Sequence, residues 1–164
     1  MIRDEHLIGL GEIMISFATL ENMILDTFII TLITNGPSKD APVGQMVCAQ
    51  LTFSTKVDLI SSLFPFRCAD ASLRERMNAS LTKAKGMNTI RNRIVHSAWI
   101  ADVSDTGKLF REKTTAKFGV GLNTETHQYT GRELKGIAKE IDQVNVDLFK
   151  IYSDWYDQLR PRLK

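Results

Sequence analysis

The chain has 164 residues, of which 43% are hydrophobic and 24% charged, and its formal net charge is +2. This length is enough for a single domain over 1–164 to bury its own core, and the composition is that of an ordinary globular protein. So small a positive charge does not by itself indicate a nucleic-acid partner. Cys48 and Cys68 are too far apart for a short metal-binding loop, and the opening "MIRDEHLIGL" lacks the layout of a signal peptide. We therefore expect a reduced, cytoplasmic protein.

The first predicted element is a long helix over about 5–33. Its apolar residues recur at three- and four-residue steps, as in an amphipathic helix, and "TNGPS" follows as a stop. Charges at Glu12, Glu21 and Asp26 argue against a lipid-facing span. We expect a core helix and no membrane contact. The residues with this period are Leu10, Ile13, Phe17, Leu20, Ile24 and Phe28.

Two further helices are expected in the middle of the chain. In "STKVDLISSLF", Thr55 and Asp58 have the spacing of a capping box, and Pro65 is expected to close the helix. A shorter helical turn from Val43 precedes it. The third helix is expected over about 71–98.

After Trp99 the apolar pattern alternates, which is typical of strands. We expect a short strand over 99–103, a turn at "SDTG" and a longer strand over 109–122. Apolar side chains of the longer strand should lie on one face, with the polar and basic ones on the other. The basic face is either solvated or an RNA backbone contact. The apolar face has Phe110, Ala116, Phe118, Val120 and Leu122, and the other face has Arg111, Lys113, Thr115 and Lys117.

The last helix is expected to begin at "TGRE", where Thr130 and Glu133 form a second capping box, and to end at Pro161. The predicted fold is therefore mainly all-α. It is an up-and-down bundle of about four helices, with a β-hairpin (about 99–122) inserted between the third and fourth helices.

Polar residues gather near the end of the third helix, in "RNRIVH". On a helical wheel Arg91 lies in the apolar stripe, while Asn92, His96 and Lys85 follow its edge. A core-facing arginine needs a partner, and Glu21, in the middle of the apolar face of the first helix, is our candidate. The alternatives are an ordinary basic helix end for Arg91 and His96, and a rim carboxylate for Glu21.

The six residues "RNRIVH" resemble the R-N-x-x-x-H form of the R-x(4–6)-H motif of HEPN domains, which are helical and often metal-independent RNases. "GEIMISFATLE" and "LTFSTKVDLISSL" also look like the first two helices of the bacterial and phage members. The resemblance implies an endoribonuclease without metal or cofactor, acting as a homodimer in which both protomers line one cleft. It also implies a role in toxicity, phage defence or RNA turnover, and an antitoxin or inhibitor protein as a further partner.

These residues suit cleavage of RNA by its own 2′-hydroxyl. His96 can exchange protons near neutral pH, and Arg91 can neutralise charge on the phosphoryl oxygens. Asn92 can orient His96 or bind a phosphate oxygen. Lys85 and Glu21 are the supporting residues, and Arg111, Lys113 and Lys117 are the predicted RNA contacts. The alternative function is a non-catalytic HEPN-like helical dimer that binds a nucleotide or a protein.

Overall fold

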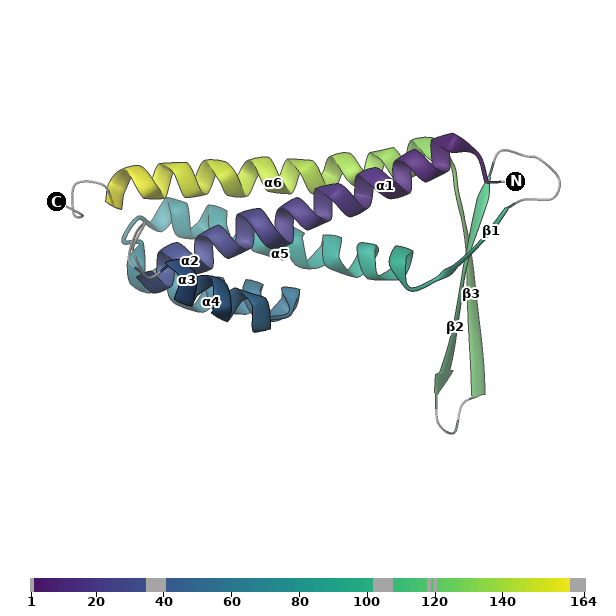
Figure 1. The fold of residues 1–164 in the computed structure, drawn as a ribbon, viewed down its shortest axis with the longest axis horizontal. Coiled ribbons are helices and arrows are strands. Elements are labelled where there is room, and N and C mark those ends of the chain that lie inside the picture. The colour runs from purple at the N-terminus through teal and green to yellow at the C-terminus, as the bar shows by residue number, and fades with distance from the viewer. Residues whose placement is uncertain (1, 35–40, 102–107, 118, 120, 160–164) are drawn as a thin grey trace.

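The computed structural model describes residues 2–34, 41–101, 108–117, 119 and 121–159 (Figure 1). It is mainly helical and carries a small antiparallel sheet of three strands, in the order β1-β2-β3. The expectation of a mainly α-helical fold is therefore confirmed.

The first helix is a continuous rod built from three segments. They are α1 (Asp4–Ala18), the π-helical η1 (Thr19–Leu25) and α2 (Asp26–Thr34). The helix expected over 5–33 is thus present, but its middle is wider than an α-helix, because π-helical bonds span five residues instead of four. The rod Asp4–Thr34 is also long and apolar enough to cross a membrane by length and composition alone. Its residues Ile13, Phe17, Leu20, Leu25 and Phe28 are at most 2% exposed, and lie in the core.

Two helices, α3 (Ala41–Gln50) and α4 (Phe53–Arg67), follow the rod. The turn expected from Val43 belongs to α3. The expected cap of α4 is wrong: the Thr52 side chain accepts the bond from the Thr55 backbone N–H, at 3.3 Å. The helix also continues two residues past Pro65, because the proline lies in the last turn, where its ring removes only one late bond of the helix.

The motif lies at the end of α5 (Ala71–Val95), whose N-cap Asp70 accepts a bond from the Leu73 backbone N–H at 3.1 Å. The helix stops three residues before the expected position. His96 is therefore the C-cap residue, and its backbone N–H bonds the Asn92 carbonyl at 3.1 Å.

The insertion has three strands: β1 (Ala98–Ala101), β2 (Leu109–Lys117) and β3 (Gly121–Tyr129). The single long strand expected over 109–122 is therefore wrong. Gly119 and Gly121 have φ of 77° and 96°, and these left-handed positions reverse the chain between β2 and β3. Val103, Phe118 and Val120 lie outside the described residues. The β2–β3 ribbon extends away from the helices (Figure 1).

The last helix is α6 (Gly131–Leu159). Its expected capping box is confirmed: the Thr130 backbone N–H donates to Glu133 Oε2 at 2.7 Å, and the Glu133 backbone N–H donates to Thr130 Oγ1 at 3.2 Å. The bond from the Thr130 backbone holds the pKa of Glu133 below its usual range. Pro161 lies beyond the part of the chain that is described.

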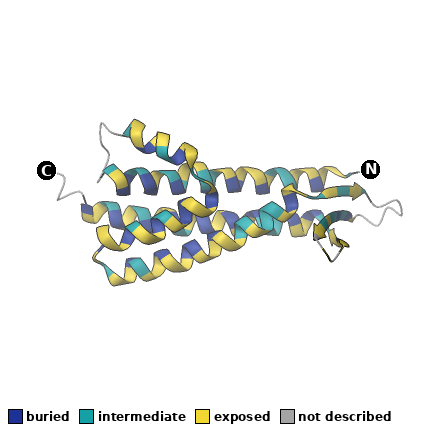
Figure 2. Cartoon of the chain, turned by 90° about the horizontal axis from the view of Figure 1, so that it is seen from below, coloured by how far each residue is buried: buried dark blue, intermediate teal, exposed yellow. Residues whose placement is uncertain are grey.

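The rod and α6 run side by side in the same direction, with α5 running the opposite way (Figure 1). The rod and α6 approach closely near their first turns, where a Cβ added to Gly9 would lie 2.7 Å from Leu134 Cβ. Further along, Asn145 Nδ2 donates to the Ser16 carbonyl at 3.0 Å. Figure 2 shows the buried residues on the inward faces of the long helices. The motif on α5 thus begins in a helical core and ends at the sheet.

Candidate anion-binding site

Arg91 lies one turn from the end of α5, with its guanidinium at the surface of the core. Its Cζ lies 5.0 Å from the centre of the Phe17 ring. Its Nη1 donates to Asn92 Oδ1 at 2.9 Å, while its buried Nε has no hydrogen-bond partner among the described residues. The ring face attracts the cation, and the Asn92 amide fixes the direction of the guanidinium.

Glu21 does not pair with Arg91, contrary to our expectation. No ion pair joins the two among the described residues, although Glu21 is partly buried and lines the same cavity. Phe17 and Glu21 lie four residues apart on the rod, and Phe17 takes the position against the guanidinium. The α-helical wheel on which the pairing was predicted does not hold beyond Thr19, where the wider π-helical segment begins.

Arg91 and Asn92 open into a cavity of about 330 Å³ between the rod, the start of α4 and α5. Hydroxyl and amide side chains also line this cavity, and their O–H and N–H groups can donate to an oxygen anion. Sequence reasoning missed these lining residues, although Asn88 lies one helical turn before Asn92 and could have been found by that spacing. The added lining residues are Phe17, Thr52, Phe53, Ser54 and Asn88.

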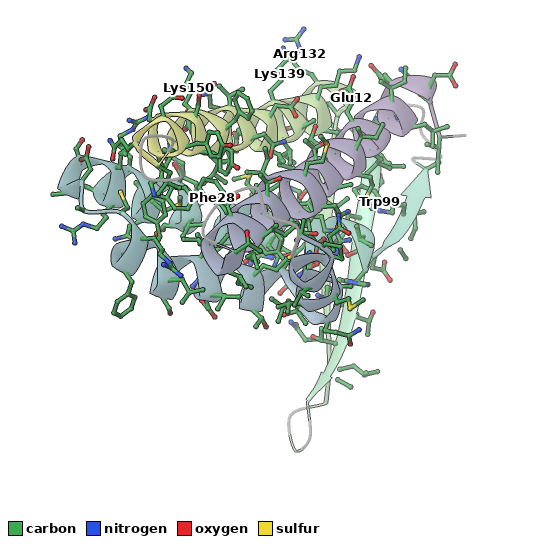
Figure 3. The ribbon with its side chains drawn as sticks, turned by 60° about the vertical axis from the view of Figure 1, so that its left-hand side comes forward. Glu12, Phe28, Trp99, Arg132, Lys139 and Lys150 are labelled. Atoms are coloured by element: carbon green, nitrogen blue, oxygen red, sulfur yellow. The ribbon has the colours of Figure 1, made fainter. Side chains whose placement is uncertain are left out.

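His96 is exposed and is not among the residues that line this cavity. The structure therefore brings Arg91 and Asn92 together but does not place His96 with them inside one chain. The end of the helix beside His96 is fixed by the sheet. Trp99 of β1 (Figure 3) donates its Nε1–H to the Ile94 carbonyl at 3.0 Å. His96 is thus held on an anchored turn at the surface.

Arg111 is not available as an RNA contact within this structure. Its side chain is only 6% exposed, Nη1 donates to Ser97 Oγ at 3.1 Å, and Nη2 lies 3.9 Å from Glu125 Oε2. The expected basic face turns inward at its start, where Leu109 and Arg111 are both buried and Arg111 bonds Ser97, two residues after the end of α5. Lys113 is partly buried, and the side chain of Lys117 is outside the described part of the structure.

The other supporting cation, Lys85, also has a partner of its own. Its Nζ lies 2.7 Å from Asp58 Oδ1, in an exposed ion pair, and the residue does not line the Arg91 cavity. Exposed cations occur elsewhere as well: Arg132, Lys139 and Lys150 project from α6 (Figure 3). The predicted edge of Lys85, Asn92 and His96 is therefore not one site within a single chain.

Over the described ranges, no group of three or more histidine, cysteine, aspartate or glutamate side chains is arranged to hold a metal ion. The cavity presents a guanidinium and neutral donors, and the Glu21 carboxylate also lines it. The guanidinium and the neutral donors suit an oxyanion with several oxygens, such as a phosphate.

No protein-family model matches the chain, and no curated protein or solved structure shows significant similarity to it.

Proposed function

We propose that the chain is a metal-independent endoribonuclease of HEPN type, with its active site shared by two copies. The corresponding fold is a bundle of about four helices, with the rod, α4, α5 and α6 as its members and the sheet as the insertion. It departs from a strict up-and-down order, because the rod and α6 run in the same direction (Figure 1). We also place the protein in the cytoplasm, with toxicity, phage defence or RNA turnover as its setting and an antitoxin or inhibitor as its regulator.

The observation that carries this proposal is the state of Arg91. The guanidinium is partly buried and oriented by Asn92 and Phe17, yet it has no carboxylate partner among the described residues. A desolvated cation without a counter-ion attracts an anion. The hydroxyl and amide groups around it favour a phosphate over a simple halide.

The chemistry proceeds by attack of the substrate's own 2′-oxygen on the adjacent phosphorus, which expels the 5′-oxygen of the next nucleotide. His96 takes the 2′ proton or supplies the proton to the leaving oxygen. Arg91 neutralises the charge that develops on the phosphoryl oxygens, and Asn92 holds its guanidinium in place. The products are a 2′,3′-cyclic phosphate and a 5′-hydroxyl, so atoms and charge balance without an added reactant.

A second copy completes the site, because His96 does not line the Arg91 cavity of its own chain. Two α5 ends placed side by side would bring two histidines and two arginines to one cleft. One histidine could then act as base while the other acts as acid.

The second candidate function is a non-catalytic dimer that binds a nucleotide or a protein through the Arg91 cavity. The specific observation that favours it is the separation of exposed His96 from that cavity. Under this alternative Arg91 remains important for binding, whereas His96 has no role.

The test incubates the purified protein with mixed cellular RNA in EDTA, beside the His96→Ala and Arg91→Ala variants. We expect cleavage by the wild type and a loss of about 100-fold or more in each variant. His127→Ala and Arg93→Ala are matched controls, because both positions are exposed and line no part of the cavity. An inactive wild type, or variants as active as the wild type, would refute the nuclease.

A further inference from the structure

A second, larger cavity is also lined by Glu21. Its volume is about 690 Å³, within the range of small-molecule sites. The helical segments η1 and α2 form one wall of this cavity. Helix α3 and the start of α4 form the other wall. Glu21 lines both this cavity and the one that contains Arg91, so the two are neighbours on the surface.

The charges in the larger cavity are not balanced. Lys56 has a side chain only 5% exposed, and its Nζ lies 2.8 Å from Asp26 Oδ1. This ion pair neutralises the buried cation and one carboxylate. Glu21 is left as a partly buried carboxylate with no hydrogen bond or ion pair among the described residues. The two oxygens of this unpaired carboxylate can accept N–H donors from a ligand in the cavity.

The rest of the lining combines apolar and polar side chains. Met23, Ile30 and Leu51 supply apolar surface, while the side chains of Asn22 and Gln45 add amide donors and acceptors. Small-molecule sites combine apolar surface with placed polar groups. Proteins bind unpaired RNA bases in part through hydrogen bonds to the base edges.

Among the RNA bases, guanine fits the free carboxylate best. Its N1–H and N2–H donors lie side by side and can bind the two oxygens of one carboxylate. Uracil presents one N–H between two carbonyl oxygens, which a carboxylate repels. Adenine and cytosine offer one amino group beside an acceptor nitrogen. A single carboxylate therefore discriminates guanine from the other three.

We propose that the larger cavity binds the guanine base of a nucleotide whose phosphate lies at Arg91, with the Glu21 carboxylate accepting the guanine N1–H and N2–H. The placement of the phosphate rests on the proposed function. The recognition of the base does not depend on catalysis. Glu21 is then the residue that determines base specificity, at the border between the two cavities.

The test measures binding of GMP, AMP, CMP and UMP to the full-length protein by calorimetry. These mononucleotides have no 3′-linked neighbour, so cleavage cannot affect the result. We expect GMP to bind about tenfold or more tightly than UMP, and Glu21→Gln to abolish this preference. Arg91→Ala should weaken all four nucleotides and leave the preference for GMP unchanged.

Two further variants keep the result interpretable. Glu12→Gln, at an exposed position of α1 (Figure 3), makes the same change in charge outside both cavities and should leave the preference intact. Ala49→Leu fills the larger cavity without altering Glu21, and should weaken GMP binding in a protein that unfolds at an unchanged temperature. Equal binding of the four nucleotides, or a preference that survives Glu21→Gln, overturns the proposal.

The two proposals fail in different ways. A protein that binds GMP through Glu21 but cleaves no RNA supports the base site and refutes the nuclease. A protein that cleaves RNA equally after all four bases and binds the four mononucleotides equally supports the nuclease and refutes the base site.

Discussion

At the scale of single residues, Arg91 presents a cation at the surface of a hydrophobic core because two neighbours take the place of a carboxylate. Phe17 contributes its ring face and Asn92 its amide oxygen. Both attract the guanidinium without neutralising it. The positive charge therefore remains available to an anion.

Asn92 offers a direct test of this arrangement. In Asn92→Asp, a carboxylate of nearly the same shape lies against the guanidinium and neutralises it, so RNA affinity should fall by at least about tenfold. Asn92→Ala should lower the RNA affinity less, because it removes the group that orients the Arg91 guanidinium but leaves the positive charge unneutralised. Filter binding at a fixed salt concentration measures the RNA affinity of both variants. Equal affinity in Asn92→Asp and the wild type would show that the Arg91 charge is not what the RNA contacts.

Cys48 gives the folded protein a predictable dependence on alkaline pH. Burial, followed by the Asp26 charge, raises the pKa of its thiol from 9.0 to about 11. In the unfolded chain the thiol ionises first, so the stabilising contribution is complete below pH 9 and is lost as the pH rises towards 11. The free energy of unfolding should fall by about 2 kcal/mol over this interval.

Cys48→Ala separates this effect from the titration of lysines and tyrosines. Urea unfolding at pH 8, 9, 10 and 11 should show a fall in the wild type that is about 2 kcal/mol larger than in the variant. If the free energy of unfolding falls equally with pH in the two proteins, the alkaline loss of stability does not come from Cys48.

The sequence predicts the surroundings of some residues correctly and of others wrongly, for physical reasons. Periodicity shows that Arg91 faces inward, but it does not choose between Phe17 and Glu21, which lie one turn apart on the same helix. A π-helical segment has no sequence pattern of its own in this chain, so the direction of Glu21 could not be predicted. The burial of Arg111 also depends on tertiary contacts, since its guanidinium bonds Ser97, which precedes β1.

At the scale of elements, local sequence patterns determine where the helices form, but they do not determine the strands of the sheet. The capping box of Thr130 and Glu133 is confirmed because both partners are local. At α4 two threonines compete, and Thr52 is the cap because the helix begins at Phe53. The turn at Gly119 was missed because alternation continues through it. The anchoring of the α5 end by Trp99 requires the sheet to be in place.

The contact between the rod and α6 is close enough to be tested by one methyl group. In Gly9→Ala the new Cβ would lie 2.7 Å from Leu134 Cβ, which cannot rotate away. The two helices must separate, and the protein should lose about 1–3 kcal/mol of stability.

Gly11→Ala is the matched control on the same helix. No atom outside the local backbone lies within 4 Å of its added Cβ. This substitution should stabilise the protein by about 0.5–1 kcal/mol, because alanine favours the helix. Urea unfolding measures the stability of both variants. Equal changes in the free energy of unfolding would contradict the close packing at Gly9.

At the scale of the whole molecule, the proposed activity depends on two copies of the chain. The Arg91 cavity of one chain does not contain His96, so a monomer would present the proposed phosphate site without the proposed proton donor and acceptor. Small-angle scattering should report a dimer at the protein concentrations at which RNA is cleaved. Full activity in a solution shown to be monomeric would refute the shared site while leaving the Arg91 cavity as a binding site.

The most direct measurement uses one RNA oligonucleotide and its 2′-deoxy counterpart, each incubated with the wild type in EDTA and compared with His96→Ala. We predict that only the RNA is cut, leaving a 2′,3′-cyclic phosphate and a 5′-hydroxyl, and that His96→Ala cuts neither. Cleavage of the deoxy strand, a product with a 5′-phosphate, or undiminished cutting by His96→Ala would contradict the account.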